Sequence, residues 1–174
     1  KKIIMKILLI GPQGSGKSTQ GKLLAKYLNI PFISTGDIFR EIANEDSSEG
    51  RRIKQILDEG RLVDDATVVS LIKKKIASDE FQDGFILDGY PRTLEQAEEI
   101  SDLNFDKAIY FKVGDEVVLE RLLKRGRIDD TQELISKRLA LYHEQIQPLL
   151  EYYRTKGLLL GVDGVSEINE IQAD

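Results

Sequence analysis

A glycine-rich stretch near the start of the chain could bind phosphate. Residues 11–18 read Gly-Pro-Gln-Gly-Ser-Gly-Lys-Ser, which fits G-x-x-x-x-G-K-[ST], and Thr19 follows. Residues 6–10, which are apolar after Lys6, predict a buried strand before it, and residues 18–28 predict a helix after it, which is the context that this pattern requires. Glycines let successive N–H groups face phosphate oxygens, and the helix adds the positive end of its dipole. We therefore predict a polyphosphate site in which Lys17 lies between the β- and γ-phosphates and Ser18 supports Mg²⁺.

A carboxylate stands at the end of a second apolar run. Residues 86–88 read Ile-Leu-Asp. In a P-loop fold, an aspartate at the carboxyl end of such a strand can hold a Mg²⁺-bound water. Taken alone, Asp88 would be better interpreted as a turn or helix-cap residue. Next to the phosphate site we interpret it as part of a magnesium centre.

Several arginines are candidates for contacts with phosphate, because a guanidinium can bind phosphate oxygens through two N–H groups. Positions 121, 124, 125 and 127 are all Arg or Lys, and Arg138 follows one helix later. Arg121 and Arg125 are four residues apart and so share a helix face. Arg40 and Arg92 each follow a glycine-containing turn. The alternative for such a charge cluster is a solvated helix face, which is our interpretation of Lys73–Lys75 and Arg51–Arg52.

The elements that must position these residues alternate along the chain. Apolar runs predict strands at 6–10, 32–33, 85–87, 108–111 and 158–160, and helical spacing predicts helices at 18–28, 37–44, 49–59, 66–77, 95–100, 116–124, 132–153 and 166–171. Continuous apolar strands that alternate with helices indicate a parallel sheet covered on both faces. We therefore predict an α/β fold: one P-loop domain over residues 1–174, a three-layer sandwich with helices on both sides of a five-stranded parallel sheet.

Composition excludes several classes of function. The 174 residues contain no cysteine and one histidine, and their net charge is −5. A thiolate nucleophile, a cysteine zinc site and a multi-histidine metal site are therefore impossible. The acidic balance disfavours nucleic acid as a partner, and no apolar run approaches the roughly 18 residues of a membrane span. We expect a cytoplasmic monomer without membrane or nucleic-acid partners, and we interpret His143 as an exposed helix residue.

Taken together, several segments resemble the adenylate kinase family of nucleoside monophosphate kinases. They keep the order and spacing of that family across nearly the whole chain, and Asp-Gly-Tyr-Pro-Arg-Thr is specific to it among P-loop proteins. The segments are Gly11–Thr19; Ser34–Asp37 with Arg40; Gly60–Val63; Asp88–Thr93 with Gln96; and Arg127–Asp130 with Arg138. The resemblance implies Mg²⁺-dependent, reversible transfer of the γ-phosphoryl group of ATP to AMP, which gives two ADP.

The resemblance also implies roles for individual residues. The implied ATP-binding residues are Gly14, Ser15, Gly16, Lys17, Ser18, Thr19, Arg121, Arg125 and Gly164. The implied AMP-binding residues are Thr35, Arg40, Leu57, Arg61, Leu62, Val63, Gly89, Tyr90, Pro91, Arg92, Gln96, Arg127 and Arg138; among them Gln96 would read the adenine edge. The implied catalytic residues are Lys17, Arg92, Arg125, Arg127 and Arg138. Ser18, Asp88 and Asp37 would hold Mg²⁺, mostly through water.

Two further features follow from the resemblance. Residues 34–63 would form a helical arm that binds the nucleoside monophosphate, and residues 125–131 a minimal lid, because only Gly126 separates Arg125 from Arg127. Relatives carry several residues or a small zinc-binding domain there. With no cysteine and one histidine, this chain lacks the ligands for such a domain, so we expect no zinc. Thr35 and Thr93 favour AMP as the acceptor. The alternatives are a kinase of the same fold for UMP, CMP or another small molecule, and a non-enzymatic nucleotide-binding switch.

Overall fold

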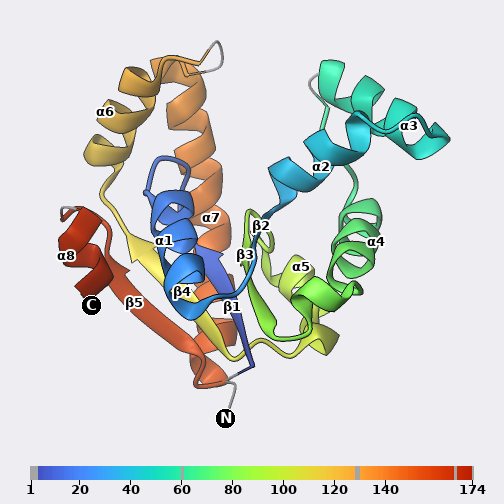
Figure 1. The fold of residues 1–174 in the computed structure, drawn as a ribbon. Coiled ribbons are helices and arrows are strands. Elements are labelled where there is room, and N and C mark those ends of the chain that lie inside the picture. Colours follow the sequence, from blue (N-terminus) through green and yellow to red (C-terminus); the bar gives the residue numbers. More distant parts are fainter. Residues whose placement is uncertain (1–3, 60, 128–129, 167, 174) are drawn as a thin grey trace.

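A single sheet of five parallel strands organises the molecule (Figure 1). The computed structural model describes residues 4–59, 61–127, 130–166 and 168–173. The strands lie in the order β2-β3-β1-β4-β5, so β1 is central. Their bounds are Met5–Ile10 for β1, Phe32–Ser34 for β2, Gly84–Asp88 for β3, Lys107–Lys112 for β4 and Leu159–Asp163 for β5. Every paired strand runs parallel to its neighbour, as predicted.

Apolar side chains of the central strands fill a core on each face of the sheet. Side chains alternate along a strand, so Leu8 and Ile10 of β1 join one core cluster while Ile7 and Leu9 join another. All five residues of β3 are buried, which explains why it is a continuous apolar run. This two-sided burial confirms the three-layer sandwich.

The helices occupy both faces and one end of the sheet. On one face, Ala25 of α1 and Ile171 of α8 are in the second cluster. Ile146 and Leu149 of α7 are in the first, together with residues of α2 to α5. The helix bounds are α1 Lys17–Leu28, α2 Thr35–Ala43, α3 Ser48–Asp58, α4 Asp65–Ile76, α5 Leu94–Glu99, α6 Asp115–Arg125, α7 Gln132–Thr155 and α8 Ile168–Ala173. None of the helices in the described ranges is long and apolar enough to cross a membrane.

The register of the strands brings the carboxyl ends of β1, β2 and β3 to the same edge of the sheet. Asp88 pairs with Leu9 of β1 and with Ser34 of β2, and Ile10 pairs with Tyr110 of β4. The glycine-rich loop, Asp88 and the start of α2 therefore lie at the carboxyl edge of the sheet, where ligands of such folds bind. In Figure 1 the arm formed by α2 and α3 lies on one side of α1, and α6 lies on the other.

Element boundaries differ from the prediction by a few residues. Strand β5 was predicted at 158–160 but runs over Leu159–Asp163. It is an edge strand with half-exposed and exposed residues, and Gly161 interrupts its apolar run, so the pattern ends too early. The last helix was predicted at 166–171 and lies at Ile168–Ala173, with residue 167 outside the described part. Two 3-10 helices, Asp79–Phe81 and Ser101–Leu103, were missed because three residues carry no periodicity.

Candidate active site

The glycine-rich loop ends in a helix start that is open to an anion. Gly16 is the N-cap of α1 and has a φ of +83°, and no side chain among the described residues caps the helix. A left-handed φ suits glycine, and the first N–H groups of a helix lack partners inside it. The Ser15 hydroxyl is 1% exposed and has no hydrogen-bond partner among the described residues. A buried polar group of this kind is expected to have a partner, and a phosphate oxygen would supply one.

Lys17, the first residue of α1, lies among several charged groups. Its side chain is 14% exposed, and its Nζ is 3.9 Å from Asp88 Oδ1 and donates to the Pro12 carbonyl at 3.3 Å. Burial lowers the pKa of Lys17, Asp88 raises it, and Arg92 and Arg125 lower it further. Lys17 of α1 thus lies within electrostatic range of Arg92, in the loop after β3, and of Arg125, at the end of α6.

Asp88 ends β3 beside this lysine. The Ser18 hydroxyl donates to Asp88 Oδ2, and Oδ1 is buried without a hydrogen-bond partner among the described residues. Only 4% of Asp88 is exposed. The predicted phosphate and magnesium residues Lys17, Ser18 and Asp88 therefore form one contact group.

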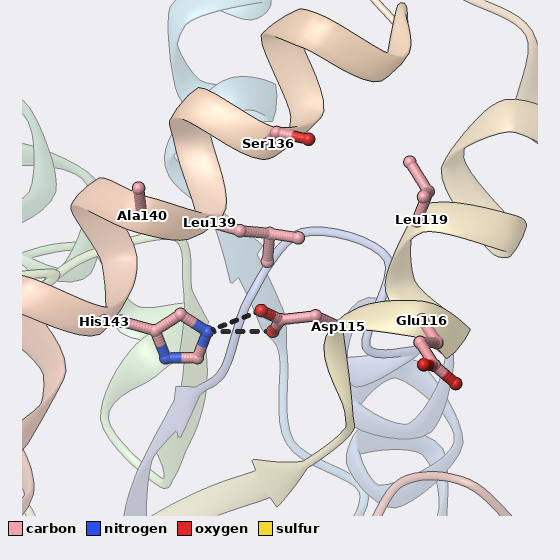
Figure 2. A pocket seen from close by; sticks show the side chains of 7 residues that line it. All are labelled: Asp115, Glu116, Leu119, Ser136, Leu139, Ala140 and His143. Carbon is pink, nitrogen blue, oxygen red and sulfur yellow. Dashed lines mark hydrogen bonds and ion pairs between the residues drawn. The ribbon is translucent and has the colours of Figure 1, made fainter.

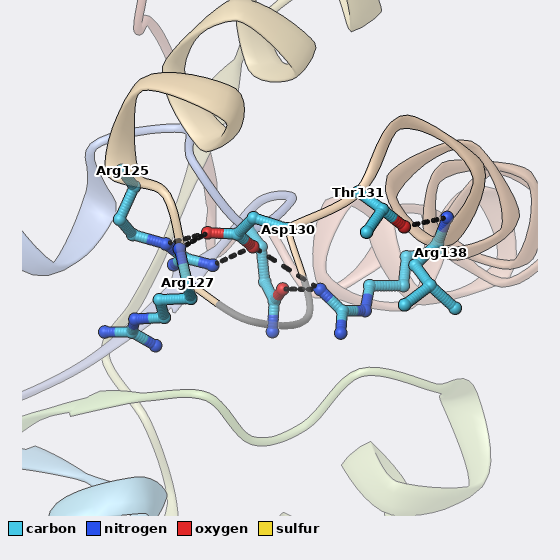
Figure 3. Close-up of polar contacts among 7 residues, drawn as sticks. Arg125, Arg127, Asp130, Thr131 and Arg138 are labelled. Atoms are coloured by element: carbon cyan, nitrogen blue, oxygen red, sulfur yellow. Dashed lines mark hydrogen bonds and ion pairs between the residues drawn. The ribbon is translucent and has the colours of Figure 1, made fainter.

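Asp130 organises the cations of the lid (Figure 3). Its side chain is fully buried and accepts hydrogen bonds from Arg125 Nε at 2.7 Å and Nη2 at 2.6 Å, and from the backbone N–H of Arg127 at 3.2 Å. The hydrogen bonds from Arg125, more than any other influence, hold the pKa of Asp130 below its ordinary value. Arg138 Nη1 lies 3.8 Å from the same carboxylate and donates to Gln13 Oε1 of the glycine-rich loop at 3.5 Å. One aspartate thus holds Arg125 and Arg138 beside the glycine-rich loop, residues 11–18, which is called the phosphate loop from here on.

The side chain of Arg127, another predicted lid residue, does not join this cluster. Figure 3 shows the Arg127 guanidinium directed away from Asp130, and the residue is exposed. Ile128 and Asp129, which belong to the quoted lid segment, lie outside the described residues. In this conformation the structure joins Arg125 and Arg138, but not the Arg127 side chain, to the Asp130 carboxylate.

Arg121 connects the phosphate loop to the turn after β5. Its Nη1 donates to the Gly14 carbonyl at 3.4 Å and its Nη2 to the Gly164 carbonyl at 3.0 Å. A Cβ at position 164 would lie 3.1 Å from the Ser15 carbonyl oxygen, so this turn packs directly on the loop. Three residues predicted to bind ATP from distant parts of the sequence therefore lie together.

The residue after β3 lies very close to the start of α2, in the region of the predicted AMP-binding residues. Gly89 has a φ of +94°, and a Cβ there would lie 2.6 Å from Thr35 Oγ1. Arg92 Nε donates to the Gly89 carbonyl at 2.9 Å. Tyr90 and Pro91 are buried, and burial together with a hydrogen bond to Glu99 raises the pKa of Tyr90. Thr35, Gly89 and Arg92 thus adjoin the carboxyl end of β3.

Gln96 lies next to this loop. It belongs to α5, whose N-cap is Thr93. Its Oε1 accepts from the backbone N–H of Arg92 at 2.7 Å, and its Nε2 donates to Asp65 Oδ1 of α4 at 2.9 Å. Both ends of the amide are therefore occupied by groups from different elements.

Other predicted residues lie along the arm. Arg40 pairs with Asp37, which lowers the pKa of that carboxyl, and Arg61 pairs with Glu59 at 2.6 Å. In these pairs Arg40 and Arg61 bind carboxylates of the arm itself, so the pairs do not connect the arm with Lys17. Leu62 is 93% exposed. Leu57 of α3 is partly exposed and Val63 is half-buried against the first core cluster, while Gly60 lies outside the described residues.

A cavity of about 290 Å³ between α6 and α7 is separate from this site (Figure 2). Asp115, Glu116, Leu119, Ser136, Leu139, Ala140 and His143 line it, and no residue predicted for the site is among them. His143 Nε2 lies 2.8 Å from Asp115 Oδ1, and the His143 side chain is 54% exposed. The prediction of an exposed helical histidine is confirmed, whereas its pairing with Asp115 was not predicted.

Sequence reasoning missed the organising roles of three residues. For Asp130 the sequence predicted no role beyond membership of the lid segment. A carboxylate close in sequence to Arg125, Arg127 and Arg138 is nevertheless a signal for a group that holds cations. Asp65 precedes the helix predicted at 66–77, which favours a capping interpretation, whereas in the structure it is the first residue of α4 and Asp64 is the cap. No local signal marks Gln13, because its contact with Arg138 joins residues 125 positions apart.

Comparison with known proteins decides the family. The family model for adenylate kinase matches residues 9–158. The chain belongs to the adenylate kinase family. It is 42% identical over 175 residues to an adenylate kinase of Mycobacterium sp. (strain MCS), covering 97% of this chain and 96% of the relative. It is also 42% identical over 177 residues to one of Bifidobacterium longum, covering 96% and 95%, and 41% identical over 173 residues to one of Corynebacterium aurimucosum, covering 95% and 96%.

Proposed function

We propose that this adenylate kinase family member transfers the γ-phosphoryl group of ATP reversibly to AMP, giving two ADP, with Mg²⁺ as its metal. One observation carries the proposal. Cations from separate elements, Lys17, Arg92, Arg125 and Arg138, gather around a phosphate loop whose buried Ser15 hydroxyl has no hydrogen-bond partner in the part of the chain that the structure describes. Such a concentration of positive charge suits a pair of polyphosphates better than a neutral substrate.

The arrangement fits the needs of phosphoryl transfer between nucleotides. The oxygen of an AMP phosphate is already anionic, so the reaction needs no strong general base. It needs the two phosphate chains held in line and positive charge on the moving group. Lys17 and the helix start of α1 would bind the donor chain, Arg92 the acceptor phosphate, and Arg125 and Arg138 the group between them.

The residues present fit a magnesium ion. Asp88 Oδ1 is a buried carboxylate oxygen without a hydrogen-bond partner among the described residues, and the Ser18 hydroxyl adjoins Oδ2. Within the described ranges no group of three or more Asp, Glu or His side chains could hold a metal, so phosphate oxygens and water would complete the shell. Asp37 is an additional candidate, although here it pairs with Arg40. The ion would neutralise phosphate oxygens and help to align them.

Nucleotide binding on both sides of the phosphate loop would bring two segments of the chain toward each other. We propose that residues 34–63 bind AMP and residues 125–131 close over ATP; residues 60, 128 and 129 are outside the described part. Among the described residues, the side chains of Arg40 and Arg61 pair with exposed carboxylates of their own segment, and such exposed pairs are weak enough for the arginines to turn to a phosphate. Closure would also exclude water, which competes with AMP as the acceptor.

An acceptor panel tests the proposal. ADP formation is measured from ATP and Mg²⁺ with AMP, UMP, CMP or no acceptor. We expect fast turnover with AMP only; turnover with a pyrimidine monophosphate instead would indicate the alternative kinase, and binding without product a nucleotide-binding switch.

Two variants test the residues. Arg92→Ala and Arg138→Ala are expected to lower kcat by on the order of 10³, since removing a transition-state arginine costs about 10³–10⁵ in phosphoryl transfer. Lys124→Ala, whose partner is the exposed Glu120 on the same helix, is the matched control and should keep its activity. Rates within a few-fold of wild type for both arginine variants would remove these residues from the mechanism.

We further propose that the enzyme is a cytoplasmic monomer without a nucleic-acid partner. The net charge of −5 supports the last point, because binding to a phosphate backbone depends on excess positive charge. Light scattering after size exclusion gives the oligomeric state directly; a mass near twice 19.7 kDa would contradict the monomer.

A further inference from the structure

We propose that Asp65 fixes the orientation of the Gln96 amide and thereby makes the monophosphate site select adenine over 6-oxopurines such as hypoxanthine and guanine. The inference rests on the proposed function, in which Gln96 reads the base of AMP. Asp65 is a positioning residue in this scheme and does not itself touch the substrate.

The two hydrogen bonds of the Gln96 amide admit only one orientation. The backbone N–H of Arg92, 2.7 Å from Gln96 Oε1, can only donate. An ionised Asp65 carboxylate, 2.9 Å from Nε2, can only accept. If the amide flipped, its NH₂ group would face the N–H and its oxygen would face the carboxylate, so both hydrogen bonds would be lost and both contacts would become repulsive.

A side-chain amide has more hydrogen-bonding capacity than these two contacts use. Within the described ranges, the second lone pair of the oxygen and the second hydrogen of the NH₂ group have no partner. Gln96 is only half-buried, so both can face a ligand. The fixed amide therefore offers one acceptor and one donor side by side, in a set order.

That order distinguishes the purines. The Watson–Crick edge of adenine has a donor at N6 and an acceptor at N1, which match an amide oxygen and an amide N–H respectively. Hypoxanthine and guanine reverse the pattern, with an acceptor at O6 and a donor at N1. A flipped amide would match them, so a glutamine free to rotate would accept both types of base. Discrimination therefore depends on the two groups that prevent the flip.

The Arg92 N–H belongs to the backbone, so of the two groups that hold the Gln96 amide, Asp65 is the one that a side-chain substitution can change. Asn at position 65 can accept or donate, so it fits either orientation of Gln96. Asp64→Asn is the matched control, because it removes the same charge one residue away while Asn can still cap α4 as Asp64 does. Asp65→Glu keeps a group that only accepts and serves as the conservative rescue.

A helix-capping role for Gln96 is the competing explanation. Thr93 and Gln96 have the spacing of a capping box, and the Thr93 hydroxyl accepts from the Gln96 N–H at 3.3 Å. If Gln96 and Asp65 only stabilise the start of α5, their loss would lower the stability or kcat for all acceptors alike. The ratio of kcat/KM for two acceptors is insensitive to such a general effect.

The experiment measures kcat/KM for AMP, IMP and GMP with ATP as donor in the full chain. For Asp65→Asn we expect the AMP-to-IMP ratio to fall by about 2- to 10-fold, which corresponds to one hydrogen bond of net strength 0.5–1.5 kcal/mol. The change for AMP should appear in KM more than in kcat, Asp64→Asn should keep the wild-type ratio, and Asp65→Glu should recover most of it. Unchanged ratios in Asp65→Asn would overturn the inference.

Gln96→Ala separates this failure from that of the proposed base contact. If Gln96→Ala changes the ratio and Asp65→Asn does not, Gln96 reads the base without help from Asp65 and only the inference is wrong. If Gln96→Ala also leaves the ratio unchanged, the amide does not read the base, and the base contact and the inference fail together. ADP formation from AMP would still stand as an independent result.

Discussion

Gly89→Ala should destabilise the protein through a strained backbone conformation and one identifiable contact. Gly89 has a φ of +94°, and a Cβ there would lie 2.6 Å from Thr35 Oγ1, while its next contacts are at 3.8 Å. The left-handed backbone costs an alanine about 1–2 kcal/mol. Overpacking against the Thr35 hydroxyl adds about 1–3 kcal/mol. The free energy of unfolding should therefore fall by about 2–5 kcal/mol, a large part of the 5–15 kcal/mol typical of a domain.

The double variant Gly89→Ala/Thr35→Ala separates the two costs. Removing Oγ1 leaves the nearest Thr35 atoms at an ordinary 3.8 Å, so the overpacking part disappears while the backbone part stays. In urea unfolding of the wild type, both single variants and the double variant, we expect a favourable coupling of about 1–3 kcal/mol. Additivity within about 0.5 kcal/mol would refute the reasoning, because distant and independent sites behave in that way.

Three further predictions concern the charged groups. Lys17→Met should abolish ADP formation and keep the circular dichroism spectrum of the wild type; a fully active variant would remove Lys17 from the phosphate site. Asp88→Asn should move the alkaline limb of kcat/KM for ATP to lower pH, because Asp88 raises the pKa of Lys17, whose ammonium must stay protonated to bind phosphate. An unchanged or higher limb would contradict this coupling. His143→Ala should change the free energy of unfolding by less than about 1 kcal/mol, since its pair with Asp115 is half-exposed, and should leave kcat unchanged. A large loss of kcat would connect the α6–α7 cavity with catalysis.

The sequence predicted the parts of the site that are continuous in the chain. The phosphate loop is one such part, because strand, glycines, lysine and helix follow each other within about 25 residues and their physics is local. The sheet was also predictable, since buried parallel strands are apolar runs. Edge strand β5 was placed less well, because it has exposed positions and a glycine.

Contacts between distant elements could not be predicted from local pattern. The positions of Asp65 and Gln96 differ by 31 residues, and those of Asp115 and His143 by 28. Nothing in the residues around Asp65 distinguishes a carboxylate that holds an amide from one that caps a helix. Asp130 is an intermediate case: its neighbours in the sequence include the arginines that it binds, but its complete burial depends on how α6 and α7 pack.

The central claim is that cations from separate elements converge on two phosphate chains joined end to end. A crystal structure of the protein with a linked bisubstrate analogue, two adenosines joined by a polyphosphate, tests it most directly. We expect nitrogens of Lys17, Arg92, Arg125 and Arg138 at about 2.7–3.2 Å from phosphate oxygens. A bound analogue with these side chains directed away from its phosphates would contradict it.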